Sequence, residues 1–140
     1  MMSFLKSTAI EKSKQREARV RLTIELLELL EKARKENVRW KGSVTDLMEV
    51  VHIAYQTGRV CNPDGSLCQF GDMVSRTCLL LNIRMPMHPR QTAFSAEQRK
   101  GVKRDTFFVR YYRMMMANEE KADCRLSILR MYTEDNSSGC

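Results

Sequence analysis

An uninterrupted stretch from about Thr8 to Asn37 contains no glycine or proline and is rich in Glu, Lys, Arg and Leu. This composition predicts one long helix, because these residues have high helix propensity and nothing breaks the backbone hydrogen bonding. The first two turns carry almost no large apolar residue, so we expect them to project or fray. Farther along, apolar side chains recur at helical spacing and form one stripe of Leu22, Leu26, Leu29, Leu30 and Ala33.

Ser43 and Gly58 delimit a second predicted helix, from Val44 to Thr57. Ser43 offers an N-cap hydroxyl and Asp46 follows three residues later, which is an acidic variant of the capping box. Gly58 suits the end of the helix, because glycine adopts the left-handed cap conformation at little cost. The buried face expected for this helix consists of Leu47, Val50, Val51, Ala54 and Tyr55.

A turn cluster and a third apolar repeat follow the second helix. Residues 62–65 are Asn, Pro, Asp and Gly, a combination that favours a turn. The preceding residues, Arg59 to Cys61, are expected to form at most a very short strand. Apolar side chains at three- and four-residue intervals then predict a helix from about Leu67 to Asn82, with an inward face of Leu67, Phe70, Met73, Val74, Cys78 and Leu81.

Two prolines, Pro86 and Pro89, interrupt the chain again, because each disfavours helix at the residue before it. Pro89 also suits the first position of a helix. We therefore predict a short polar helix from Pro89 to Lys100, with Ala93, Phe94 and Ala96 facing inward. A basic loop over residues 101–105 should follow it.

The last part of the chain is predicted to contain one strong helix and one short helical piece. Asp105 or Thr106 can cap the strong helix, which carries aromatic residues and methionines, and the short piece covers Leu126 to Met131. From Thr133 onward the residues are Glu, Asp, Asn, Ser and Gly, so residues 133–140 are expected to form a disordered tail.

A chain of 140 residues that is 43% hydrophobic can bury the core of one domain. The expected fold is all-α, or mainly α with a minimal wing. Residues 1–38 form the long amphipathic helix, with Trp40 docking it onto the core, and residues 39–132 form the helical domain. No apolar run approaches the roughly 20 residues needed to span a bilayer, and no secretory signal is evident. We expect a cytoplasmic protein with no membrane partner.

The five cysteines are odd in number and lack the close pairing of a structural zinc site. They therefore favour reduced thiols and no bound metal. Cys61, Cys68 and Cys78 are expected to be small buried side chains, and Cys140 an exposed thiol.

Basic residues are concentrated in one region of the chain. The formal net charge is +7, and residues 82–113 hold eight basic and two acidic side chains. An excess of this kind favours a polyanionic partner such as nucleic acid. The basic residues fall on the predicted short helix, the loop after it and the start of the last helix, which is the arrangement of a recognition helix with a basic wing.

A helix that enters the major groove needs polar side chains that reach base edges, with Arg and Lys nearby for phosphates. The segment from Pro89 to Lys100 supplies both kinds. We expect it to act with the third helix as a helix-turn-helix, through a connection from about Asn82 to His88 that is longer than the usual turn. The candidate residues for binding double-stranded DNA are Arg84, Arg90, Gln91, Thr92, Ser95, Gln98, Arg99, Lys100, Lys103 and Arg104.

Catalysis is not indicated by the sequence. His52 and His88 are the only histidines, and neither has a cysteine or paired carboxylates at a spacing typical of a nucleophilic or metal site. Gly58, Gly65 and Gly71 fit turns and caps and do not form a phosphate-binding loop. We therefore expect no catalytic residues and no cofactor.

One block of residues carries a family resemblance, namely Trp40, Gly42, Ser43, Asp46, Leu47, Glu49, Tyr55, Gly58, Asn62, Gly65, Leu81, Asn82, Ile83, Arg104, Thr106, Phe107 and Phe108. Over about Trp40 to Asn118 the chain resembles the C-terminal half of RteC-like regulators. The resemblance implies a winged-helix-like DNA-binding domain and a role in regulating excision genes of conjugative transposons that carry tetracycline resistance. Between Met85 and Lys100 the chain departs from the tyrosine-rich pattern of the family, so an operator preference is not implied.

A protein-interaction module is the alternative. In this interpretation the Leu22 to Ala33 stripe pairs with a partner helix, while the basic surface meets an acidic protein. The stripe is short for a coiled coil. A homodimer through the N-terminal helix is also considered for the DNA-binding protein.

Overall fold

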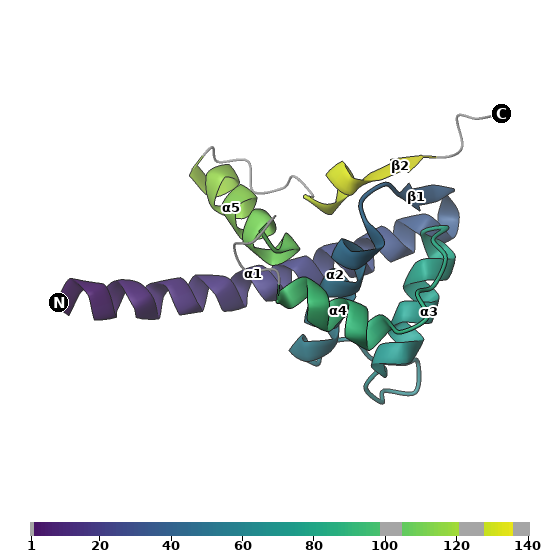
Figure 1. Cartoon of the computed structure of the whole chain (residues 1–140), viewed down its shortest axis with the longest axis horizontal. Helices are drawn as coiled ribbons and strands as arrows, with labels where there is room; N and C mark the ends of the chain where they lie inside the picture. Colours follow the sequence, from purple (N-terminus) through teal and green to yellow (C-terminus); the bar gives the residue numbers. More distant parts are fainter. Residues whose placement is uncertain (1, 99–104, 121–127, 136–140) are drawn as a thin grey trace.

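Helices form most of the described chain, which confirms the prediction of a mainly α-helical protein (Figure 1). The structure is a computed structural model that describes residues 2–98, 105–120 and 128–135. Within these ranges the elements are α1 (Met2–Lys35), β1 (Val38–Trp40), α2 (Val44–Thr57), α3 (Phe70–Leu80), α4 (Pro89–Glu97), α5 (Phe107–Glu120), the 3-10 helix η1 (Leu129–Tyr132) and β2 (Thr133–Asp135).

The long helix α1 begins earlier than predicted, and its N-terminal end extends beyond the other elements in Figure 1. Farther along, Leu22, Leu26 and Leu29 are buried in the same core as the side chains of α2. The apolar stripe predicted for α1 therefore packs inside its own chain. It is not free to pair with a partner helix in the way that the interaction module required, whereas a homodimer through the N-terminal helix stays a prediction.

Both predicted ends of α2 are confirmed. The Ser43 hydroxyl accepts a hydrogen bond from the Asp46 N–H at 3.0 Å, and Gly58 has the left-handed φ of 67°. Tyr55 was expected in the buried face but is 39% exposed. Its ring lies at the edge of the core, where it meets Phe70 at 5.7 Å between ring centres.

The segment before α3 corrects two predictions. The helix starts at Phe70, and Leu67 lies outside it with 62% of its surface exposed. Leu67 instead forms an isolated antiparallel bridge with Cys61, closed by a hydrogen bond from the Asn62 N–H to the Ser66 carbonyl at 2.7 Å. The short strand predicted at 59–61 is therefore reduced to this single bridge at Cys61. It leaves Cys61 exposed, contrary to expectation, while Cys68 and Cys78 are buried as predicted.

The expected disordered tail is wrong for Thr133–Asp135, which form β2. This strand pairs antiparallel with β1, with Trp40 opposite Thr133 and Val38 opposite Asp135. Backbone hydrogen bonds make such a ladder whatever the side chains are, and a polar edge strand is common. The pairing places Tyr132 over the buried ring of Trp40, at 5.7 Å between ring centres.

Aromatic packing joins α5 to the part of the core around Trp40 and Tyr132. The ring of Phe107 lies 6.3 Å from that of Trp40 and 5.0 Å from that of Tyr132. At the start of α5 the hydroxyl of Thr106 accepts a hydrogen bond from the Val109 N–H at 3.2 Å, as predicted for a cap. η1, from Leu129 to Tyr132, confirms the C-terminal part of the expected short helical piece, while Leu126 and Ser127 lie outside the described residues.

Candidate nucleic-acid interface

Five exposed side chains form one face of α4: Arg90, Gln91, Phe94, Ser95 and Gln98, the last at the C-cap. A helix turns by about 100° per residue, so residues four apart lie on the same side, and these five fall within an arc of about 140°. We call this surface the α4 face. Four of its five residues are sequence-predicted DNA contacts, and the structure brings them together.

The opposite side of α4 fixes the helix on α2. Ala93 and Ala96 are fully buried, and their small side chains allow the two helices to pack closely. A hydrogen bond of 2.6 Å joins Nδ1 of His52 in α2 to Oε1 of Glu97 in α4. The α4 face is therefore presented outward by a helix whose other side is held in place.

Phe94 was predicted to face inward, and this prediction is wrong. Its side chain is 63% exposed and lies at the centre of the α4 face. The reason is helical geometry: Ala93 and Ala96 occupy the side turned toward α2, and Phe94 is rotated by about 100° from Ala93. Sequence spacing did not separate these two positions, because both residues are apolar.

The remaining predicted contacts are placed differently. Thr92 is half-buried, and its hydroxyl donates a hydrogen bond to the His88 carbonyl at 3.0 Å, so it is not part of the α4 face. Arg84 is exposed in the segment between α3 and α4. Four other predicted contacts lie outside the described residues: Arg99, Lys100, Lys103 and Arg104.

The arginines of the basic stretch fall into two groups. Arg110 pairs with Asp46 at 2.8 Å, and Arg113 pairs with Asp105. Arg84 and Arg90 are exposed, and within the described residues no carboxylate forms an ion pair with either of them. Positive charge is therefore available at α4 and just before it, while the charge on α5 is partly neutralised inside the protein.

Arg90 also makes a contact that orients it. Its guanidinium lies 5.9 Å from the centre of the Phe70 ring, near the limit for a cation–π interaction. Phe70 begins α3, so this contact lies between the starts of α3 and α4. The guanidinium is held over the ring without an acidic partner, and its donors can still reach an anion.

Buried carboxylates hold the C-terminal elements on the core, and sequence reasoning did not identify them as such. Glu49 accepts hydrogen bonds from the Phe107 and Phe108 N–H groups at 3.0 and 2.8 Å. Glu25 accepts hydrogen bonds from the Tyr111 hydroxyl and from the Leu129 N–H. Burial is the largest cause of the raised pKa of Glu49 and of Tyr111.

A signal for these acids does exist in the sequence. Glu25 lies between Leu22 and Leu26 within the apolar stripe of α1, and Glu49 lies beside Val50 on α2. A carboxylate at such a position must find donors when the face is buried. Their partners include backbone N–H groups, the Tyr111 hydroxyl and, for Glu25, the guanidinium of Arg21 at 3.7 Å, so these acids fit a stabilising role.

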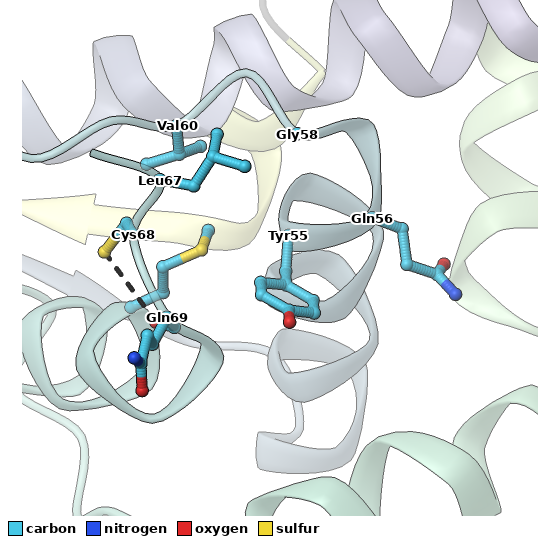
Figure 2. Close-up of a pocket in the computed structure, with 8 residues that line it drawn as sticks. Tyr55, Gln56, Gly58, Val60, Leu67, Cys68 and Gln69 are labelled. Atoms are coloured by element: carbon cyan, nitrogen blue, oxygen red, sulfur yellow. Dashed lines mark hydrogen bonds between the residues drawn. The ribbon is translucent and has the colours of Figure 1, made fainter. Parts of the chain in front are cut away.

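A small pocket of 290 Å³ opens between the end of α2 and the start of α3 (Figure 2). Its described lining carries no charged side chain: Tyr55, Gln56, Gly58, Val60, Leu67, Cys68, Gln69 and Met73. The thiol of Cys68 donates to the Gln69 carbonyl at 3.7 Å, as the dashed line in Figure 2 marks. Among the described residues of this lining there is no carboxylate, histidine, lysine or arginine that could activate the thiol.

A larger groove of 780 Å³ lies among α1, α2, α4 and α5. Acidic and basic groups both line it, including Glu11, Glu97 and Arg19, whose guanidinium lies 4.6 Å from the centre of the Phe108 ring. Such a mixed lining does not select one kind of ligand. Across the described residues, no group of three or more His, Cys, Asp or Glu side chains is placed to hold a metal ion.

Comparisons with known proteins add no relative: no family model, curated protein or solved structure matches the chain. Among the described helices, none combines the length and apolarity that crossing a membrane requires.

Proposed function

We propose that this protein binds double-stranded DNA through the α4 face and acts as a transcriptional regulator. The observation that carries the proposal is the convergence of Arg90, Gln91, Ser95 and Gln98 on one exposed side of a helix fixed from behind. Arg and Gln side chains make bidentate hydrogen bonds with guanine and adenine edges in the major groove, and serine can also hydrogen-bond to base edges.

The arrangement of helices also supports the proposal. α3 and α4 both pack on α2, and in helix-turn-helix proteins the second helix enters the groove while the first braces it. The connection over residues 81–88 is longer than usual for that motif. A wing over residues 101–105 belongs to the same proposal, although 101–104 lie outside the described residues.

Regulation of a mobile element, in the manner of RteC-like regulators, is the finer part of the proposal. It rests on the resemblance of the segment from Trp40 to Asn118 to that family. Trp40 and Glu49, two residues of that resemblance, are buried and bind other parts of the core, so they support the scaffold of the proposed domain.

The experiment that tests DNA binding selects duplexes from a random pool and measures affinity for them over a salt series. If about four to six phosphates are engaged, the logarithm of affinity should fall with the logarithm of salt concentration with a slope of about −4 to −5. A flat salt dependence, or no duplex binding at low salt, would overturn the proposal.

Paired variants inside and outside the α4 face test whether this face is where DNA binds. Arg90→Ala should weaken binding by about tenfold, since each good base or phosphate contact is worth roughly 1–3 kcal/mol. Arg39→Ala, which removes an exposed arginine of β1, should change affinity by less than about twofold. Gln91→Ala should alter the selected sequence, whereas Gln56→Ala, at an exposed position of α2, should leave it unchanged.

A protein-interaction module is the second candidate, now on different residues. Ile24 and Leu27 of α1 are exposed on the side opposite the buried stripe. Binding of an acidic protein with no duplex binding at low salt would favour this candidate, and Ile24→Ala should then reduce that binding.

A further inference from the structure

Phe94 is the least expected member of the α4 face. It lies between Arg90 and Gln98 along the helix, and Gln91 and Ser95 lie beside it on one side. Its ring makes no contact with another aromatic ring or with a cation among the described residues. A large apolar side chain at the centre of a polar surface does not contribute to the core.

Few groups on the base edges of the major groove are apolar enough to pack against such a ring. Guanine, cytosine and adenine present hydrogen-bond donors and acceptors there, and thymine adds its C5-methyl group. That methyl is the apolar group on the base edges of the groove, and phenylalanine is among the side chains that contact it. The hydrogen-bonding neighbours of Phe94 can contact the adjoining base pairs.

We infer that Phe94 is a specificity-determining residue that packs on the C5-methyl group of a thymine and so makes the α4 face prefer a T·A pair at one position. The inference rests on the proposed function, because it requires α4 to lie in the major groove. It deepens that proposal by naming one base and the atom that is recognised.

The test uses the full chain and a fluorescent duplex selected from a random pool by the parent protein. Each thymine of that duplex is replaced singly by deoxyuridine, which pairs identically but lacks the methyl group. Burying one methyl group corresponds to about three- to fivefold in affinity, so the parent protein should lose this factor at one thymine. Phe94→Ala should bind the thymine duplex at least about threefold more weakly and should no longer distinguish thymine from deoxyuridine there.

Control variants separate this contact from general effects. Leu79→Ala removes an apolar side chain of α3 that is 79% exposed, and it should keep the full thymine preference. Phe94→Leu keeps an apolar side chain and should retain part of the preference. Because Phe94 is mostly exposed, the melting temperature of Phe94→Ala should stay within about 3 °C of the parent value.

The two proposals fail in different ways. Salt-dependent duplex binding without a methyl-sensitive thymine would overturn the role of Phe94 and leave DNA binding standing. The same holds if Phe94→Ala keeps the methyl sensitivity of the parent protein. Absence of duplex binding at low salt would overturn both proposals.

Discussion

The carboxylate of Glu49 in α2 caps α5 by accepting the backbone N–H of Phe107, 58 positions later in the chain, at 3.0 Å. Its second oxygen accepts the Phe108 N–H at 2.8 Å, so both oxygens bind the start of the helix. A carboxylate is favourable at a helix N-terminus, where the N–H groups and the helix dipole carry partial positive charge.

Glu49→Gln should change how stability depends on pH. Burial raises the pKa of Glu49 above its ordinary value of 4.5, the two N–H groups oppose this, and the charges of Asp46 and Glu97 add to it. The unfolded chain therefore releases this proton at lower pH than the folded protein does.

The parent protein should consequently lose stability relative to Glu49→Gln as pH rises from 4.5 through the raised pKa. Urea unfolding of both proteins between pH 4 and 8 measures this difference, and other titrating groups largely cancel in it. If the difference in free energy of unfolding between the two proteins stays constant, or grows in favour of the parent as pH rises, the raised pKa of Glu49 is contradicted.

Arg110→Met should destabilise the protein by about 3 kcal/mol. The side chain of Asp46 is almost completely buried, and the variant removes the guanidinium that lies 2.8 Å from it. Arg113→Met is the control on the same helix, because its ion pair with Asp105 is largely exposed and should contribute less than about 1 kcal/mol. Urea midpoints measure both, and equal losses would argue against a special role for the buried pair.

Gly42→Ala should destabilise the protein by about 1–3 kcal/mol. A Cβ atom at Gly42 would lie 3.0 Å from Nε1 of Trp40, and the indole cannot withdraw easily, because this nitrogen donates to the Ser43 carbonyl. Gly71→Ala is the matched control in α3, where a Cβ atom meets nothing within 4 Å. It should stabilise the protein by about 0.5 kcal/mol. Trp40 fluorescence reports unfolding in both, and a neutral Gly42→Ala would show that the indole can shift.

His52→Ala should loosen α4 without changing the charge of the α4 face. It removes the hydrogen bond to Glu97 and the edge contact with the Phe70 ring, whose centre is 5.5 Å away. We expect a loss of about 1 kcal/mol and faster hydrogen exchange of the α4 amides. Duplex affinity should fall for all sequences alike, whereas His88→Ala, at an exposed histidine, should leave exchange and affinity unchanged. Slower or unaltered exchange in His52→Ala would contradict this role.

Local chemistry made the ends of several helices predictable from sequence. Ser43 and Gly58 define the ends of α2, and Pro89 begins α4, because caps and proline act through atoms a few residues away. The apolar repeat of α1 likewise predicted its buried side. The start of α3 was not predictable in this way, because the bridge between Cys61 and Leu67 takes Leu67 out of the helix.

The candidate interface was predictable only in part. The polar character of α4 follows from its sequence, but the exposure of Phe94 depends on which side of α4 meets α2. Glu49 could be recognised as an acid on an apolar helix face, yet its partners at Phe107 and Phe108 could not be named. The pairing of β2 with β1 has no signal in the sequence of Thr133–Asp135, since backbone groups make it.

The sequence by itself determined which segments form helices, which face of α1 is buried and where positive charge is concentrated, because propensity, capping and periodicity act within a few residues. The tertiary structure decided how α4 is turned on α2, which arginines keep their charge available and which carboxylates are enclosed. These depend on contacts between residues far apart in the chain, such as His52 with Glu97 and Asp46 with Arg110. Local sequence patterns carry no information on such pairs until the helices pack.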